Sequence, residues 1–140
     1  MDLEPFKQTA IEAARKSATI LQSRFGKISR IRKKENAEIV TEADTESEEV
    51  IISTIHAEFP DHAVLGEECG LITGTSEYKW IVDPLDGTVN FAHQIPIFSI
   101  SIALAVRDTI VLGIILDPVK DELYAAVSGQ GAQLNGEPIR

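Results

Sequence analysis

The chain contains a single cysteine, Cys69, and this scarcity excludes two kinds of structure. No disulfide can form within the chain, and a zinc site built from a Cys/His set is excluded as well. A reducing compartment fits such a composition, so we expect a cytoplasmic protein. Because Glu67 and Glu68 directly precede Cys69, we expect these carboxylates to raise the pKa of the thiol and leave it unreactive.

Long apolar runs and positive charge are also scarce. No apolar run approaches the roughly 18 residues that a membrane span requires, and the N-terminus is acidic and amphipathic, unlike a secretory signal. The formal net charge of −9 argues against a general nucleic-acid binder. One basic cluster, residues 27–34, reads most simply as a solvated turn or edge strand. The alternative is that Lys33 or Lys34 reaches the acidic residues downstream and helps to hold a substrate phosphate.

The chain has 140 residues, of which 44% are hydrophobic, and this is enough for one domain over residues 1–140. Apolar residues recur at a helical period near the N-terminus, which predicts a helix over residues 3–25. We expect Asp2 to be its N-cap and Gly26 to end it.

A second helix is predicted over residues 44–58, because Thr41 and Asp44 have the spacing of a capping box. Strand patterns follow. Short apolar runs end at acidic residues, residues 98–106 alternate in polarity, and later runs are separated by short turns. The predicted strands cover residues 63–66, 79–82, 98–106, 110–116 and 122–127. Short turns imply antiparallel pairing, since a parallel crossover needs a dozen or more residues. We therefore expect an α+β fold in which two N-terminal helices pack on a largely antiparallel sheet.

The most informative stretch is Trp80-Ile-Val-Asp83-Pro-Leu-Asp86-Gly87-Thr88. An apolar run delivers two carboxylates three residues apart, and Gly-Thr then opens a predicted short helix, with Thr88 as its expected N-cap. Mg²⁺ usually binds through one or two carboxylates and a substrate phosphate, and a helix start can bind an anion through its unpaired N–H groups. Together these are the minimum apparatus for phosphoryl chemistry. The alternative is a plain turn motif, because Asp-Pro and Asp-Gly are good turn dipeptides.

Two upstream fragments complete a three-part pattern, Leu65-Gly66-Glu67-Glu68 and Ile39-Val40-Thr41-Glu42-Ala43-Asp44. With these motifs in this order, the chain resembles the inositol monophosphatase family of Mg²⁺-dependent, lithium-sensitive phosphatases. The resemblance covers essentially the whole chain. It implies an inositol-phosphate phosphatase that hydrolyses its phosphomonoester with metal-activated water. It also implies a homodimer. From the net charge and the lack of a long apolar run, we expect no direct nucleic-acid partner and no membrane.

The resemblance further implies a set of metal ligands. Asp83 would bridge two Mg²⁺ ions, and Glu67 would bind the first ion together with the backbone oxygen of Leu85. Asp86 would bind the second ion. For Glu68 three roles stay open, a third metal, a hydrogen-bond network alone, or a solvated side chain.

The remaining roles concern water and phosphate. By resemblance, Glu67 and Thr88 orient and deprotonate the attacking water, and Asp44 supports this network, although Asp44 also suits a purely structural helix start. The resemblance implies phosphate binding by Asp86, Gly87 and Thr88, and the basic cluster adds Lys33 as a candidate phosphate contact.

One departure from the family pattern bears on activity. Members of the family carry a second, α/β half, which supplies another Asp to the second metal site and residues that bind the substrate ring. The sequence ends roughly where that half would begin, so we expect the C-terminal half to be absent, Mg²⁺ affinity to be weakened and catalysis to be low. Two alternatives remain open. One is a non-catalytic metal-binding or interaction module, and the other is a related phosphatase for another sugar phosphate or a nucleoside bisphosphate.

Overall fold

A computed structural model describes residues 2–27, 31–33 and 39–139 as two main helices packed on a large sheet. The helices are α1 (Glu4–Arg24), α2 (Glu42–Glu58) and the short α3 (Thr88–Ala92). The strands are β1 (Ile31–Lys33), β2 (Ile39–Thr41), β3 (Ala63–Gly66), β4 (Gly70–Ile72), β5 (Tyr78–Asp86), β6 (Ser99–Val106), β7 (Thr109–Asp117), β8 (Glu122–Val127), β9 (Gly131–Leu134) and β10 (Glu137–Ile139). Among the described residues, none of the helices combines the length and the hydrophobicity that a membrane-spanning helix requires.

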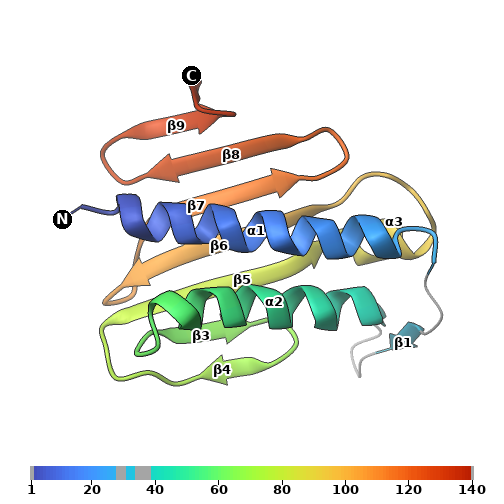
Figure 1. The fold of residues 1–140 in the computed structure, drawn as a ribbon, viewed down its shortest axis with the longest axis horizontal. Coiled ribbons are helices and arrows are strands. Elements are labelled where there is room, and N and C mark those ends of the chain that lie inside the picture. Colours follow the sequence, from blue (N-terminus) through green and yellow to red (C-terminus); the bar gives the residue numbers. More distant parts are fainter. Residues whose placement is uncertain (1, 28–30, 34–38, 140) are drawn as a thin grey trace.

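The large sheet has the strand order β10-β9-β8-β7-β6-β5-β3-β4, and β1 pairs with β2 separately. Figure 1 shows α1 and α2 side by side on one face of the large sheet. Each pair of neighbouring strands in this sheet is antiparallel except β3 and β5, which are parallel. The predicted α+β architecture, with two helices on a largely antiparallel sheet, is therefore confirmed.

Helix α1 begins one residue later than predicted. Its N-cap is Leu3, so the assignment of Asp2 as N-cap is wrong, although the Asp2 carboxylate still accepts the amide of Glu4 at 3.0 Å. The buried side of α1 consists mostly of small residues. Small side chains let two helix backbones approach closely, which explains how α2 can lie directly alongside.

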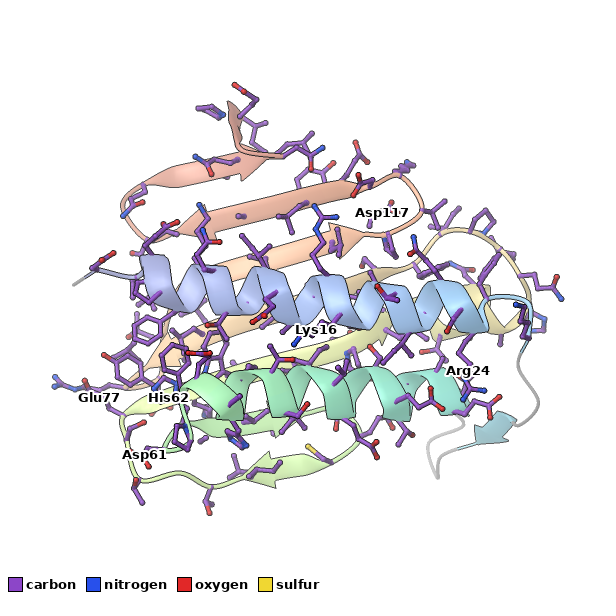
Figure 2. All side chains as sticks on the ribbon, viewed as in Figure 1. Lys16, Arg24, Asp61, His62, Glu77 and Asp117 are labelled. Carbon is purple, nitrogen blue, oxygen red and sulfur yellow. The ribbon has the colours of Figure 1, made fainter. Side chains whose placement is uncertain are left out.

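Helix α2 begins at Glu42, two residues earlier than predicted, because Thr41 is its N-cap. The predicted capping box is present, and the Thr41 amide donates to Oδ2 of Asp44 at 3.0 Å. The two helices are also joined near this end. Arg24, labelled in Figure 2, forms an ion pair with Glu46 and lies 3.6 Å from Glu42.

Strand β5 is longer than the four-residue strand predicted from its apolar run. It continues through Asp83 to Asp86, so the two carboxylates lie within the strand and not beyond its end. Asp83 pairs with Ser101 and Asp86 with Ser99, which leaves one extra residue on β5. A bulge of this kind accommodates the proline at position 84, which cannot donate to the ladder.

The sheet face away from the helices carries a continuous apolar row. Register pairs connect one residue of each strand, and all eight are apolar: Leu71, Leu65, Ile81, Ala103, Gly113, Ala126, Ala132 and Ile139. The small residues in the middle of the row form part of a hollow of about 270 Å³. A half-exposed sheet normally presents polar residues to water, so this row is typical of a face that another layer covers.

The aromatic cluster at the C-terminal end of α2 surrounds His62 (Figure 2). His62 is only 6% exposed and stacks on Phe59 with ring centroids 4.8 Å apart. The indole Nε1 of Trp80 donates to Nδ1 of His62 at 2.9 Å. An indole N–H is a donor only, so Nδ1 must be unprotonated. Desolvation by burial also lowers the pKa of His62, which makes this residue a neutral part of the core.

This arrangement predicts a loss of stability in mild acid. The unfolded chain takes up a proton at His62 near its ordinary pKa of about 6.5, whereas the folded chain resists it. The free energy of unfolding should therefore decrease as the pH falls below about 6.5. In His62→Asn, where an amide oxygen replaces Nδ1, urea denaturation between about pH 7 and pH 5.5 should show a shallower dependence. Equal slopes for wild type and variant would contradict this explanation.

Candidate functional site

The residues singled out from the sequence lie on four segments at one edge of the structure. Asp44 is in the first turn of α2, Glu67 follows β3, residues 83–86 end β5, and Thr88 begins α3. Strands β3 and β5 are parallel neighbours, so their C-terminal ends lie at the same edge of the sheet. The amide of Glu67 donates to the Val82 carbonyl at 3.3 Å, which fixes the start of the turn after β3 beside the end of β5.

Asp44 joins the start of α2 to the start of α3. Its carboxylate is 2% exposed, and Oδ2 accepts both the amide of Thr41 and its hydroxyl, the latter at 2.6 Å. The other oxygen, Oδ1, accepts the hydroxyl of Thr88 at 3.0 Å. The same hydroxyl lies 3.1 Å from the carbonyl oxygen of Leu85. One buried carboxylate thus links two of the predicted site residues.

Helix α3 differs from expectation at its first residue. Gly87, and not Thr88, is the N-cap, with φ +95°. A side chain at Gly87 would also place Cβ 2.9 Å from the Ile97 carbonyl oxygen, so both the backbone and the close approach require glycine here. Because α3 has only five residues, its dipole is small. Any anion binding here would depend on individual backbone N–H groups.

The bulge of β5 is held by one hydrogen bond within the strand and by another from α2. The Leu85 amide donates to the Asp83 carboxylate at 3.3 Å, and the Pro84 carbonyl accepts the hydroxyl of Ser47 at 3.0 Å. Ser47 is fully buried in α2 and also shares a short hydrogen bond with Ser17 of α1. Asp86 is exposed at the end of the strand. Sequence reasoning did not identify Ser47.

Glu48 is the second residue that sequence reasoning missed. Its carboxylate is 3% exposed and accepts the amides of Glu68 at 2.9 Å and Cys69 at 2.7 Å. Gly66 makes room for it, since a Cβ there would lie 2.8 Å from the Glu48 carboxyl group. Glu48 lies four residues after Asp44 on a predicted helix, so a shared helix face was the available signal.

The Cys69 thiol is poorly ionised, as expected, but the responsible carboxylate differs from the two predicted. Desolvation contributes most, and the hydrogen bond and charge of Glu48 add to it, so that the pKa of Cys69 rises to about 11. Among the carboxylates, Glu48 therefore makes the contribution to the raised pKa of Cys69 that the sequence suggested for Glu67 and Glu68.

The predicted metal ligands are oxygen donors, which is the chemistry that Mg²⁺ prefers. They are Glu67, Asp83, Asp86 and the carbonyl of Leu85. In the part of the chain that the structure describes, however, no three His, Cys, Asp or Glu side chains lie close enough together to hold a metal ion. The donor types themselves fit Mg²⁺.

The predicted phosphate contact from Lys33 lies outside what the structure describes. The backbone of Lys33 belongs to β1, but its side chain is not among the described atoms.

Comparison with known proteins gives a consistent result over the whole chain. Residues 2–140 match the inositol monophosphatase family. The chain is 39% identical to inositol monophosphatase 3 of Solanum lycopersicum and 36% identical to the Nus factor SuhB of Escherichia coli K12, covering 99% of this chain and 53% of each relative. A SuhB structure from Bartonella henselae is 36% identical and matches with a TM-score of 0.94, over 97% of this chain and 54% of that one. An IMPase structure from Thermotoga maritima is 38% identical and has a TM-score of 0.88, over 100% and 54%. The chain thus spans about half the length of these relatives, their N-terminal portion.

The buried Asp44 carboxylate predicts a large effect of its removal. Asp44→Ala should lower the free energy of unfolding by about 2–4 kcal/mol, because the capping box is lost and buried donors lose their acceptor. Urea denaturation measures this change. Glu49→Ala removes an exposed carboxylate from the same helix and should change stability by no more than about 0.5 kcal/mol. Equal losses of unfolding free energy in the two variants would show that the buried hydrogen bonds of Asp44 do not stabilise the fold.

Proposed function

Because the chain belongs to the inositol monophosphatase family, we propose that it hydrolyses a phosphomonoester, inositol monophosphate, with Mg²⁺ as cofactor. Members of the family are metal-dependent and act on phosphomonoesters, which makes the reaction class phosphoric monoester hydrolysis. The observation that carries the proposal is the Thr88 hydroxyl, which lies between the buried carboxylate of Asp44 and the carbonyl of Leu85.

This arrangement suits a hydroxyl that orients water. A threonine hydroxyl has one proton and two lone pairs. Both neighbours of the Thr88 hydroxyl, Asp44 and Leu85, are acceptors, so the proton is committed to them. A lone pair on Oγ1 then remains to accept a hydrogen bond from a water molecule. In the proposed reaction, Thr88 and Glu67 orient this water, the Glu67 carboxylate takes its proton, and Asp44 keeps Thr88 in place.

The proposed metal ligands are Glu67, Asp83, Asp86 and the backbone oxygen of Leu85. When bound, Mg²⁺ would lower the pKa of a coordinated water and balance the charge of the phosphate. The chain's own contribution is to present these oxygens from two adjacent strand ends. Phosphate contacts are proposed for Asp86, Gly87, Thr88 and Lys33.

The length of the chain restricts the proposal. The chain spans about half the length of its relatives. Complete activity, substrate choice and partners are therefore proposals for this chain. We propose that residues 1–140 form one domain with weakened Mg²⁺ affinity and low turnover by itself. Another sugar phosphate or a nucleoside bisphosphate stays the alternative substrate, and a cytoplasmic location stays a prediction.

A second candidate function, that of an interaction module, is favoured by the apolar row across the open sheet face. We propose that a second copy of this chain covers it. A two-fold axis that runs parallel to the strands, between β6 and β7, would stack the two sheets face to face. In the second copy the residues of the row then follow in the opposite order. This places Ile81 opposite Ala126 of the second copy, Leu65 opposite Ala132, and Ala103 opposite Gly113. Ile81 and Leu65 then face small residues, and the remaining pair is Leu71 opposite Ile139. Every facing pair is apolar, which suits a two-fold interface between apolar sheet faces.

The enzymatic proposal predicts Mg²⁺-dependent phosphate release from inositol 1-phosphate at a low rate. Asp86→Asn and lithium should each abolish the release, because both disturb the proposed metal site. Asp61→Asn, which removes an exposed carboxylate at the other end of α2, should leave it unchanged (Figure 2). Release that persists in Asp86→Asn would contradict the proposed ligand set. No release, with Mg²⁺ still bound, would show an incomplete half-site.

The interaction proposal predicts a mass that increases with protein concentration in sedimentation experiments. Ala126→Asp places a charge in the middle of the apolar row and should reduce the protein to monomers. Ser53→Asp introduces the same charge at an exposed position of α2, on the other side of the sheet, and should not. A monomer at all concentrations, or association unaffected by Ala126→Asp, would exclude this interface.

A further inference from the structure

Helix α2 carries a buried polar stripe that faces the site. Asp44, Ser47 and Glu48 are three and four residues apart, so they share one face of the helix, and they are 2%, 0% and 3% exposed. Each bonds to a different segment. Asp44 binds the Thr88 hydroxyl, Ser47 the carbonyl of the β5 bulge, and Glu48 two amides of the turn after β3. The proposed reaction assigns a role only to Asp44.

We propose that Glu48 is a positioning residue that holds Glu67 in place for metal binding. The inference rests on the proposed function, since Glu67 is a metal ligand only there. Glu48 itself does not contact the metal or the substrate. It acts through the backbone of the turn that follows Gly66.

The hydrogen bonds show how this turn is held. Three successive amides are bound: that of Glu67 to the Val82 carbonyl, that of Glu68 to Oε2 of Glu48, and that of Cys69 to Oε1. Because the carboxylate accepts through both oxygens, it fixes the orientation of the turn as well as its distance from α2. Charge-assisted hydrogen bonds are also about twice as strong as neutral ones. The Cα of Glu67 is thereby held beside the end of β5, next to Asp83.

The packing around the carboxylate leaves little room for another arrangement. A Cβ at Gly66 would lie 2.7 Å from the Cys69 sulfur and 2.8 Å from the Glu48 carboxyl group. The turn therefore wraps closely around Glu48. Groups that orient metal ligands in this indirect way typically change metal affinity by 10- to 100-fold when they are removed.

The matched substitution is Glu48→Gln, which preserves size but replaces one acceptor oxygen with an NH₂ group. That group would face an amide donor, so one of the two bonds is lost. Glu48→Asp is the second variant; it keeps the charge and both oxygens but shortens the side chain. Glu49→Gln is the control, because it removes an exposed negative charge from the same helix.

The experiment measures Mg²⁺ affinity by calorimetric titration of MgCl₂, with thermal unfolding to confirm that each variant is folded. We expect the dissociation constant to rise about tenfold in Glu48→Gln and in Glu48→Asp, and to stay unchanged in Glu49→Gln. A role restricted to stability would lower the unfolding temperature and leave the affinity of the folded protein unaltered.

The failures of the two proposals are distinguishable. Wild-type affinity in folded Glu48 variants overturns the positioning role and leaves the metal site intact. Absence of Mg²⁺ binding in the wild type overturns the proposed metal site, and with it the role of Glu48. An equal loss in Glu49→Gln would assign the effect to net charge and would also overturn the positioning role.

Discussion

The structure of the site depends on polar groups of α2 that are buried and bonded to other segments. The key contact is the Asp44 carboxylate, which joins the N-terminus of α2 to Thr88. A buried carboxylate without partners is very unfavourable, so each bond it makes also selects one arrangement of the chain. Ser47 and Glu48 are also buried, and they form hydrogen bonds with the β5 bulge and with the turn after β3, respectively. Helix α2 thereby holds the three segments that carry the site.

Local patterns predicted the fold well where one element decides its own structure. The capping box at Thr41 and the alternation in β6 are of this kind. The prediction was wrong for β5, because the sequence pattern ended the strand at its first acidic residue. The bulge that carries the strand on to Asp86 depends on pairing with β6, which local sequence does not specify. The short strands β2, β4, β9 and β10 were missed, since three or four residues give too little periodicity.

Some residues of the candidate site were likewise predictable from the sequence, and others were not. Its acidic and Gly-Thr motifs were recognisable from residue types and order. Glu48 and Ser47 were not, because their partners lie at least twenty residues away and the bonds exist only in the folded chain. The assignment of Thr88 as N-cap was wrong for a related reason: its hydroxyl bonds to Asp44, while Gly87 supplies the backbone geometry. The residues that form the apolar row of the sheet were identified only from the strand register.

Amide hydrogen exchange, followed residue by residue by NMR, tests the central claim that α2 holds the site segments. The amides of Glu68 and Cys69 lie in a surface turn, where exchange is ordinarily fast. If Glu48 holds them, they should exchange as slowly as the amide of Ile102 in the central strand β6. Fast exchange at both positions, together with a protected β6, would show that the turn opens independently of α2 and would contradict the account.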